Sequence, residues 1–285
     1  MPATTFISHQ SRSVGYYLWP HRIPLTVWQN RQLIRQMVGR AVASRYRGSV
    51  LGLLWSFLLP LIMLAVYTFV FSVVFRARWG GDGQESKVGF ALTLFCGLLL
   101  YNVFAECAGG SAGVIQLHAN FVKKVVFPLE ILPVVTLGAA LFNALVSVVI
   151  LLLGVAVFQQ RFPVTLVYFP AVVLPLALLS LGAGWFLASV SVYVRDTGHV
   201  VTILLQMLMF LTPLFYPISA VPEPFRVFMR LNPLSTVVEN ARCVLMQGRA
   251  PEWLGLGLLT LAGVVVMQLG YVWFMKTKRG FADVV

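Results

Sequence analysis

Few residues of this chain could do chemistry, because charged side chains make up only 11% of its 285 residues. Two adjacent lysines, Lys123 and Lys124, lie in the segment 120–133, N-F-V-K-K-V-V-F-P-L-E-I-L-P, which separates two long hydrophobic runs. Placing this pair in hydrocarbon costs several kcal/mol, so the segment must leave the apolar layer. Two interpretations stay open: an ordinary basic loop, or a helix that docks on a cytosolic partner.

Two prolines, Pro128 and Pro133, divide this segment. A proline tends to end the helix before it and can begin the next one. The pattern therefore predicts a short helix over 121–127 and a turn back into the hydrophobic layer over 129–132. Glu130 follows Pro128, where a negative charge suits a helix N-terminus.

Two further charged positions stand in or beside hydrophobic runs. Glu106 lies late in the second run beside small residues, which let helices approach closely. A carboxylate inside a membrane is a functional candidate with an expected partner on another helix, but a structural or capping role is favoured over a proton relay. Arg195 and Asp196 occupy a short turn, where Asp196 could cap the next helix or the pair could contact the segment 120–133.

The composition is that of an integral membrane protein. Hydrophobic residues make up 59% of the chain and the mean hydropathy is +0.86. The formal charge of +12 favours anionic lipid surfaces and cytoplasmic loops over nucleic acid. The sequence has no phosphate-binding G-x-x-x-x-G-K-[ST], no H-E-x-x-H, no paired carboxylates at helical spacing and no Ser/His/Asp set, and its three cysteines match no metal spacing. We therefore expect no catalytic residue, no metal site and no cofactor in this chain.

Six hydrophobic runs are each near the roughly 20 residues that a bilayer core requires. They predict an all-α membrane protein with spans at about 50–75, 88–109, 134–158, 165–192, 200–216 and 253–275. An even number of spans places both termini on one side. Lys and Arg are more numerous in the segments on the side of the termini, so both termini and the segment 120–133 are predicted to face the cytoplasm.

The chain before the first span divides into two parts. Residues 1–24 are predicted to form a cytosolic tail, and 25–47 an amphipathic helix, followed by the six-span domain 48–285. In that helix one face is apolar, formed by Leu33, Ile34, Met37, Val38 and Ala41. This face could lie on the membrane surface or pack against other protein.

The region between the fifth and sixth runs, 219–252, is too polar to span but contains two helical patterns, 225–231 and 235–246, the second with Ser235 as its predicted N-cap. Prolines divide it into short pieces. Irregular backbone at membrane depth usually lines a cavity or is buried in protein. The two interpretations are a re-entrant hairpin that closes the outer mouth of a passage and a solvated cap.

Aromatic residues are concentrated near the first, second and fifth runs. Most membrane aromatics face lipid or anchor the interface, but some could stack on sugar rings. The candidates for a passage wall are Tyr67, Phe71, Tyr101, Phe104, Phe215 and Tyr216.

Three stretches together resemble one family. They are 45–55, R-Y-R-G-S-V-L-G-L-L-W; the segment 120–133 with its K-K-V-V-F-P core; and 195–234, which runs from R-D through P-L-F-Y-P to N-P-L. This combination is similar to the membrane subunits of type-2 ABC exporters for capsular polysaccharide, O-antigen and teichoic acid.

The resemblance implies a permease that works as a homodimer with two copies of a separate P-loop ATP-binding subunit, which would hold ATP and Mg²⁺. It implies an interfacial helix over 25–44, a cytosolic coupling helix at about 120–128 and outer gate helices at about 225–246. The residues expected to couple to the ATPase are Asn120, Phe121, Lys123, Lys124, Phe127, Pro128 and Glu130. Those expected at the entrance for a phosphate-bearing lipid headgroup are Arg45, Tyr46 and Arg47.

The function so implied is export of a lipid-linked polysaccharide across the bacterial inner membrane, with membrane lipids around the protein and no nucleic acid involved. One alternative is an ABC exporter of a smaller lipid or drug. Another is an ion-coupled transporter or membrane-embedded enzyme, for which Glu106 alone is thin support.

Overall fold

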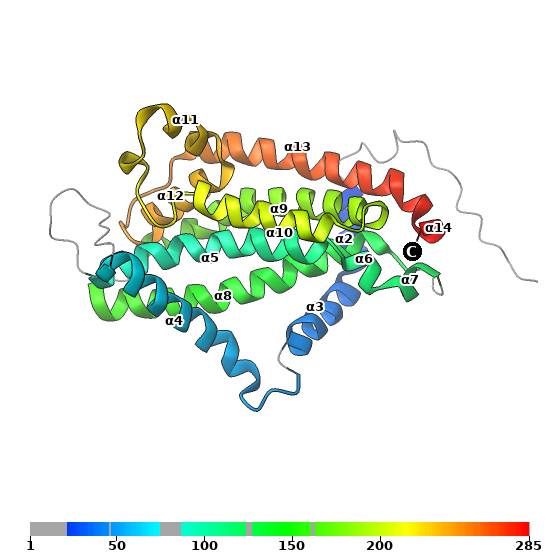
Figure 1. Cartoon of the computed structure of the whole chain (residues 1–285), viewed down its shortest axis with the longest axis horizontal. Coiled ribbons are helices and arrows are strands. Elements are labelled where there is room, and N and C mark those ends of the chain that lie inside the picture. Colours follow the sequence, from blue (N-terminus) through cyan, green and yellow to red (C-terminus); the bar gives the residue numbers. More distant parts are fainter. Residues whose placement is uncertain (1–21, 46, 75–86, 124–126, 161–162, 285) are drawn as a thin grey trace, which may run out of the picture.

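The computed structural model describes residues 22–45, 47–74, 87–123, 127–160 and 163–284, and every regular element among them is a helix. Figure 1 shows α5, α8, α9, α10 and α13 running side by side along the long axis. The short elements are gathered at the two ends of this bundle. α11 and α12 lie at one end, and α6, α7 and α14 lie at the other.

Four helices are long and apolar enough to cross a membrane: α5 (Lys87–Ser111), α8 (Leu132–Gln159), α9 (Phe169–Tyr193) and α13 (Trp253–Thr277). They coincide with the second, third, fourth and sixth predicted runs. The first and fifth runs contain the shorter apolar helices α4 (Trp55–Thr68), which continues into a π-helical turn at Phe69–Val74, and α10 (Thr197–Leu211). The membrane character predicted from composition is confirmed, and the number of six spans stays a prediction.

Helix α5 is the axis of the bundle. Every residue from 90 to 101 is buried, and the helix packs against α8, α9 and α12. On the far side of α9 lies α13, so closely that a Cβ at Gly270 would come within 2.2 Å of the Gly182 carbonyl oxygen. Small residues at such a crossing let two backbones touch.

Helix α4 departs from this parallel arrangement. Figure 1 shows it leaving the bundle at an angle, with its N-terminal end away from α8. Pro60 lies inside α4, where it removes one backbone hydrogen bond.

The N-terminal region forms two helices where the sequence predicted one over 25–47. They are α2 (Arg22–Gln29) and α3 (Arg31–Arg45), with a turn at Asn30 between them. The helix begins earlier than predicted because Pro24 lies in the first turn of α2, where a proline is tolerated. The predicted apolar face of α3 packs on α8, with Val38 against Gly138. The side chains of this face stay partly exposed, so its placement on the membrane surface stays a prediction. Residues 1–21 of the predicted tail lie outside the described part.

The outer region contains α11 (Glu223–Leu231) and α12 (Pro233–Leu245), close to the two predicted helices. The prediction that Ser235 caps the second helix was wrong. The cap is Asn232, whose side-chain oxygen accepts a hydrogen bond from the Leu234 backbone nitrogen at 3.0 Å, with Pro233 in the first turn. Helix α12 is mostly buried against α5 and α9, so it is not a solvated cap.

The opposite end is built from short pieces: α6 (Val114–Leu117), α7 (Ala119–Lys123), the 3₁₀ turn η3 (Leu129–Ile131) and α14 (Phe281–Val284). The predicted helix 121–127 begins two residues earlier, at Ala119, and residues 124–126 lie outside the described part. The turn predicted over 129–132 is η3, from which α8 continues.

Candidate functional site

The candidate coupling residues lie at the end of the bundle that carries α7. Asn120 is exposed on this helix. Phe121 stacks on Phe127 with ring centroids 4.5 Å apart, and His118 stacks on Phe121 at 5.3 Å. This aromatic stack joins α7 to Phe127, which follows the lysines in the chain. Lys124 and the side chain of Lys123 lie outside the described part.

Glu130 is held by the C-terminal part of the same chain. Its carboxylate lies 2.6 Å from the Lys278 ammonium, and its side chain is only 13% exposed. Its carbonyl oxygen accepts a hydrogen bond from the Trp185 indole at 2.9 Å. Pro128 stands at the N-cap position of the η3 turn that contains Glu130. Glu130 therefore fixes the returning segment to α9 and to the end of α13.

The turn before α10 makes no side-chain cap. Asp196 stands at the N-cap position of α10, but its side chain accepts no capping hydrogen bond. Near this turn the Gln116 amide of α6 donates to the Ser191 carbonyl oxygen of α9 at 2.5 Å, and a contact of Arg195 or Asp196 with the segment 120–133 stays a prediction.

Glu106 lies at a junction of three helices. The Arg45 guanidinium, at the end of α3, is 3.1 Å from one Glu106 carboxylate oxygen. The Asn143 amide on α8 donates to the same oxygen at 2.7 Å. The sequence predicted an interhelical partner for Glu106, and the structure supplies two. The network also favours the structural role that the sequence suggested over a proton relay.

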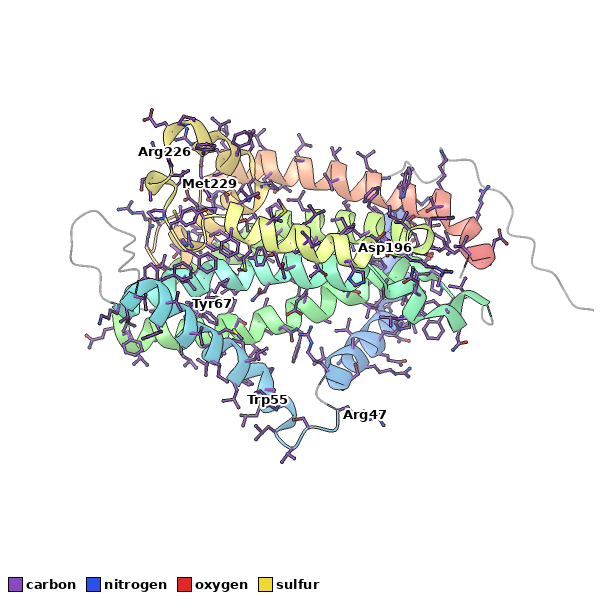
Figure 2. All side chains as sticks on the ribbon, viewed as in Figure 1. Arg47, Trp55, Tyr67, Asp196, Arg226 and Met229 are labelled. Carbon is purple, nitrogen blue, oxygen red and sulfur yellow. The ribbon has the colours of Figure 1, made fainter. Side chains whose placement is uncertain are left out.

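Arg45 and Arg47, predicted to act together, occupy different surroundings. Arg45 lines a cavity of about 200 Å³ beneath α4 with Glu106 and Asn143. Arg47 is exposed, and Figure 2 shows it on the loop after α3, away from the parallel helices. Tyr46 lies outside the described part.

The candidate passage aromatics differ in how deeply their side chains are buried. Phe215 is buried. Its ring stacks on Phe71 of the π-helical turn, with centroids 4.5 Å apart, and lies 5.6 Å from the ring of Tyr67 in α4. Tyr101 is also buried, and its hydroxyl donates to the Leu205 carbonyl oxygen of α10. Phe104 and Tyr216 are half-buried. In the single chain, Phe215 and Tyr101 hold helices together, and a passage role for the set stays a prediction.

The sequence did not single out Arg242 as a candidate residue. Its side chain is buried on α12, 4% exposed. The guanidinium donates to the backbone oxygens of Thr93 at 3.2 Å, Pro213 at 2.8 Å and Leu214 at 3.2 Å. Gly97 leaves the room for it, because a Cβ there would lie 2.8 Å from the guanidinium.

The same end holds two further polar groups. Asn232 donates to the Thr212 hydroxyl at 2.9 Å and to the Leu211 carbonyl oxygen at 3.2 Å. Burial raises the pKa of the Glu239 carboxyl above its ordinary value, and the Arg242 and Arg230 guanidinium groups partly offset that rise. The end of α10 and the loop after it are thus tied to α12 and α5 by side chains.

The described residues contain no group of three or more His, Cys, Asp or Glu side chains that could hold a metal ion. The side chains brought together instead form an ion pair, at Arg45 and Glu106, and fix backbone, at Arg242 and Asn232.

Comparison with known proteins identifies the class. The model of the ABC-2 type transporter family matches residues 32–246 of this chain, well over half its length. The chain belongs to that family, and the resemblance found in the sequence is confirmed.

Three individual relatives show which members of the family this chain is similar to. The chain is similar to the O-antigen export system permease protein RfbA of Myxococcus xanthus, 31% identical over 265 residues that cover 92% of this chain and 98% of that protein. It is also similar to RfbA of Klebsiella pneumoniae, 24% identical over 84% of this chain and 90% of that protein. The polysialic acid transport protein KpsM of Escherichia coli is 26% identical over 81% of this chain and 88% of that protein.

Proposed function

We propose that this chain is the permease subunit of an ATP-driven exporter that moves a lipid-linked polysaccharide across the bacterial inner membrane. One observation carries the proposal: the similarity to an O-antigen export permease extends over 92% of this chain. Two copies of the chain would form the passage, and two copies of a separate P-loop subunit would bind ATP and Mg²⁺. The chain itself carries no nucleotide-binding motif.

The end of the bundle that carries α7 would receive the ATP-binding subunit. Asn120 is exposed there, and the basic pair Lys123 and Lys124 would add charge for a partner. Because the Phe121–Phe127 stack joins α7 to the chain at Phe127 and the Glu130–Lys278 pair ties η3 to the end of α13, a push on α7 would move several helices together.

The opposite end would form the outer gate. Helices α11 and α12 would be re-entrant segments that close the outer mouth before the sixth span. Arg242 and Asn232 join α12 to the end of α10, so the gate would move as one rigid piece rather than as separate loops. A two-state packing of such a piece can open and close a passage without unfolding.

The second copy would cover apolar surface that the single chain leaves exposed on α10. The exposed side chains there include Val200, Ile203, Leu204, Met207, Phe210 and Leu211. Lipid can cover part of this surface, and a dimer axis beside α10 and α4 would let the rings of Tyr67, Phe71, Phe104 and Tyr216 border the passage.

The six-span arrangement would place both termini in the cytoplasm. The excess of Lys and Arg in the segments on the side of the termini supports this orientation.

The test is the surface polysaccharide of the host cell. Deleting the gene should remove the polymer from the cell surface and leave it lipid-linked on the inner side, and a plasmid copy of the wild-type chain should restore it. If surface polymer is unchanged while another lipid disappears from the outer leaflet, the chain exports a smaller lipid and the proposal is wrong.

A further inference from the structure

The C-terminal part of the chain returns to α7, the helix proposed to receive the ATP-binding subunit. Helix α13 ends at Thr277, the 3₁₀ turn η6 (Lys278–Gly280) follows, and α14 packs against α7 and α9. Figure 1 shows α14 at the same end of the bundle as α6 and α7. Two segments that are far apart in the sequence therefore meet at this end.

Helix α14 is held by one side chain. Phe281 is 0% exposed, while the three residues after it are exposed. Its ring meets the Phe274 ring of α13 edge to face, with centroids 5.4 Å apart, and lies 6.1 Å from the Tyr193 ring of α9. A helix of four residues is too short to be stable alone, so the position of α14 depends on this buried ring.

The turn before α14 is fixed on the same neighbours. The Tyr193 hydroxyl donates to the Thr277 carbonyl oxygen at 2.8 Å, and the hydroxyl oxygens of Ser189 and Thr277 lie 2.6 Å apart. A Cβ on Gly280 would lie 2.6 Å from the Tyr193 hydroxyl, so the turn leaves no room for a side chain there. Together with the ion pair between η6 and η3, these contacts set where Phe281 enters the core.

Helix α7 depends on α14 for its placement. In the part of the chain that the structure describes, α7 packs mainly on α6, which precedes it, and on α14. Phe121 and Val122 of α7 are partly buried against the core, whereas Asn120 is exposed. Beyond α14 lie α9 and α13, whose backbones are in contact where they cross.

We infer that Phe281 is a positioning residue, which holds α7 against α9 and α13 so that a push on α7 displaces these two helices. The inference rests on the proposed function in one respect, because the push would come from the ATP-binding subunit. Without the ring, α7 would still bind that subunit through its exposed side, but the short helices would take up the movement. Docking and coupling are thus assigned to different side chains of the same end.

The experiment uses the full chain, purified in mild detergent with any ATP-binding subunit that co-purifies, from a host strain whose own copy of the gene is deleted. Phe281→Ala removes the ring, Phe281→Leu keeps most of the apolar volume, and Val284→Ala changes an exposed residue of the same helix as the control. Gly280→Ala is a second test, because its methyl group displaces the Tyr193 hydroxyl and leaves Phe281 intact. Thermal unfolding checks that each variant is folded.

Hydrogen–deuterium exchange reports on α7 directly and needs neither ATP nor transport. Phe281→Ala should speed exchange in the segment 114–123 about tenfold, equivalent to about 1.4 kcal/mol of local opening free energy. The segment 223–231, at the other end of the bundle, should be unchanged and serves as the internal comparison. Gly280→Ala should act in the same direction with a smaller effect, and Phe281→Leu and Val284→Ala should exchange like wild type.

Coupling is measured from the co-purified subunit, its ATPase rate and the polymer on the cell surface. Phe281→Ala should retain the subunit at the wild-type ratio and hydrolyse ATP, yet lower surface polymer several-fold. Phe281→Leu should restore the polymer. A ring with only a structural role would instead lower the folded permease, the subunit and the polymer in the same proportion.

Unchanged exchange in Phe281→Ala, or equal effects of Phe281→Ala and Val284→Ala, would overturn the inference. Loss of the ATP-binding subunit from folded Phe281→Ala would also overturn it, because α14 would then belong to the docking surface. If wild type purifies without such a subunit, the proposed function fails, and the exchange measurement alone decides whether Phe281 holds α7.

Discussion

The two ends of the bundle are built differently. At the α12 end, the buried side chains of Arg242 and Asn232 donate five hydrogen bonds to five other residues, and one more bond caps α12. At the α7 end, helices of four or five residues are held by an aromatic stack, by the Glu130–Lys278 ion pair and by side-chain hydrogen bonds of Gln116 and Trp185. The difference indicates that the first end keeps its shape by itself, while the second offers short, exposed elements that a partner subunit can complete.

Replacing the buried guanidinium should have the largest effect on stability. Arg242→Met removes three hydrogen bonds and leaves the carbonyl oxygens of Thr93, Pro213 and Leu214 without this donor, which should lower the free energy of unfolding by about 3 kcal/mol. The measurement is thermal unfolding in detergent. Arg230→Met, on the exposed side of α11, is the control. Equal transition temperatures for the two variants would mean that the outer end is not held by Arg242.

Replacing the residue that caps α12 should have the second-largest effect on stability. Asn232→Ala removes both the cap on Leu234 and the hydrogen bonds to Thr212 and Leu211, with an expected loss of about 2 kcal/mol. Asn120→Ala, on exposed α7, should change stability little. Thermal unfolding of both variants compares the two ends directly. A larger loss of stability for Asn120→Ala than for Asn232→Ala would show that side chains hold the α7 end more firmly than the α12 end.

The ion pair of the α7 end should contribute less. Lys278→Ala leaves the Glu130 carboxylate without its ammonium partner, and because both side chains are partly exposed we expect a loss of about 1 kcal/mol. Exposed Lys276→Ala is the control. In a double-mutant cycle, Glu130→Gln should add almost nothing to Lys278→Ala; fully additive losses would show that the two residues act separately.

Much of the fold follows from the sequence, because long apolar runs require helices and prolines mark their ends. The sequence also predicted the apolar face of residues 33–41, since side chains three and four residues apart share one side of a helix. The cap of α12 was readable in principle, because Pro233 favours the first helical position and so indicates Asn232 before it, yet Ser235 fits the same preference for a polar cap.

The contacts that define the candidate sites could not be predicted from the sequence. Arg242 stands in a polar region, and only its packing beside Gly97 explains why a charge there is buried. Asn143 lies 37 residues from Glu106, and Lys278 lies 148 residues from Glu130. Such pairings depend on how helices are arranged in space, which periodicity within one helix does not encode.

We propose that the α7 end of the bundle receives an ATP-binding subunit. The most direct measurement is co-purification of the chain from its own host in mild detergent, followed by an ATPase assay, for wild type, for Lys123→Ala/Lys124→Ala and for exposed Arg249→Ala as a charge control at the other end. We predict a stoichiometric ATPase partner with wild type and Arg249→Ala, and a partner lost or uncoupled in the double variant while the permease stays folded. A permease that purifies alone and is indifferent to nucleotide, or a double variant that retains a fully coupled ATPase, would contradict the claim.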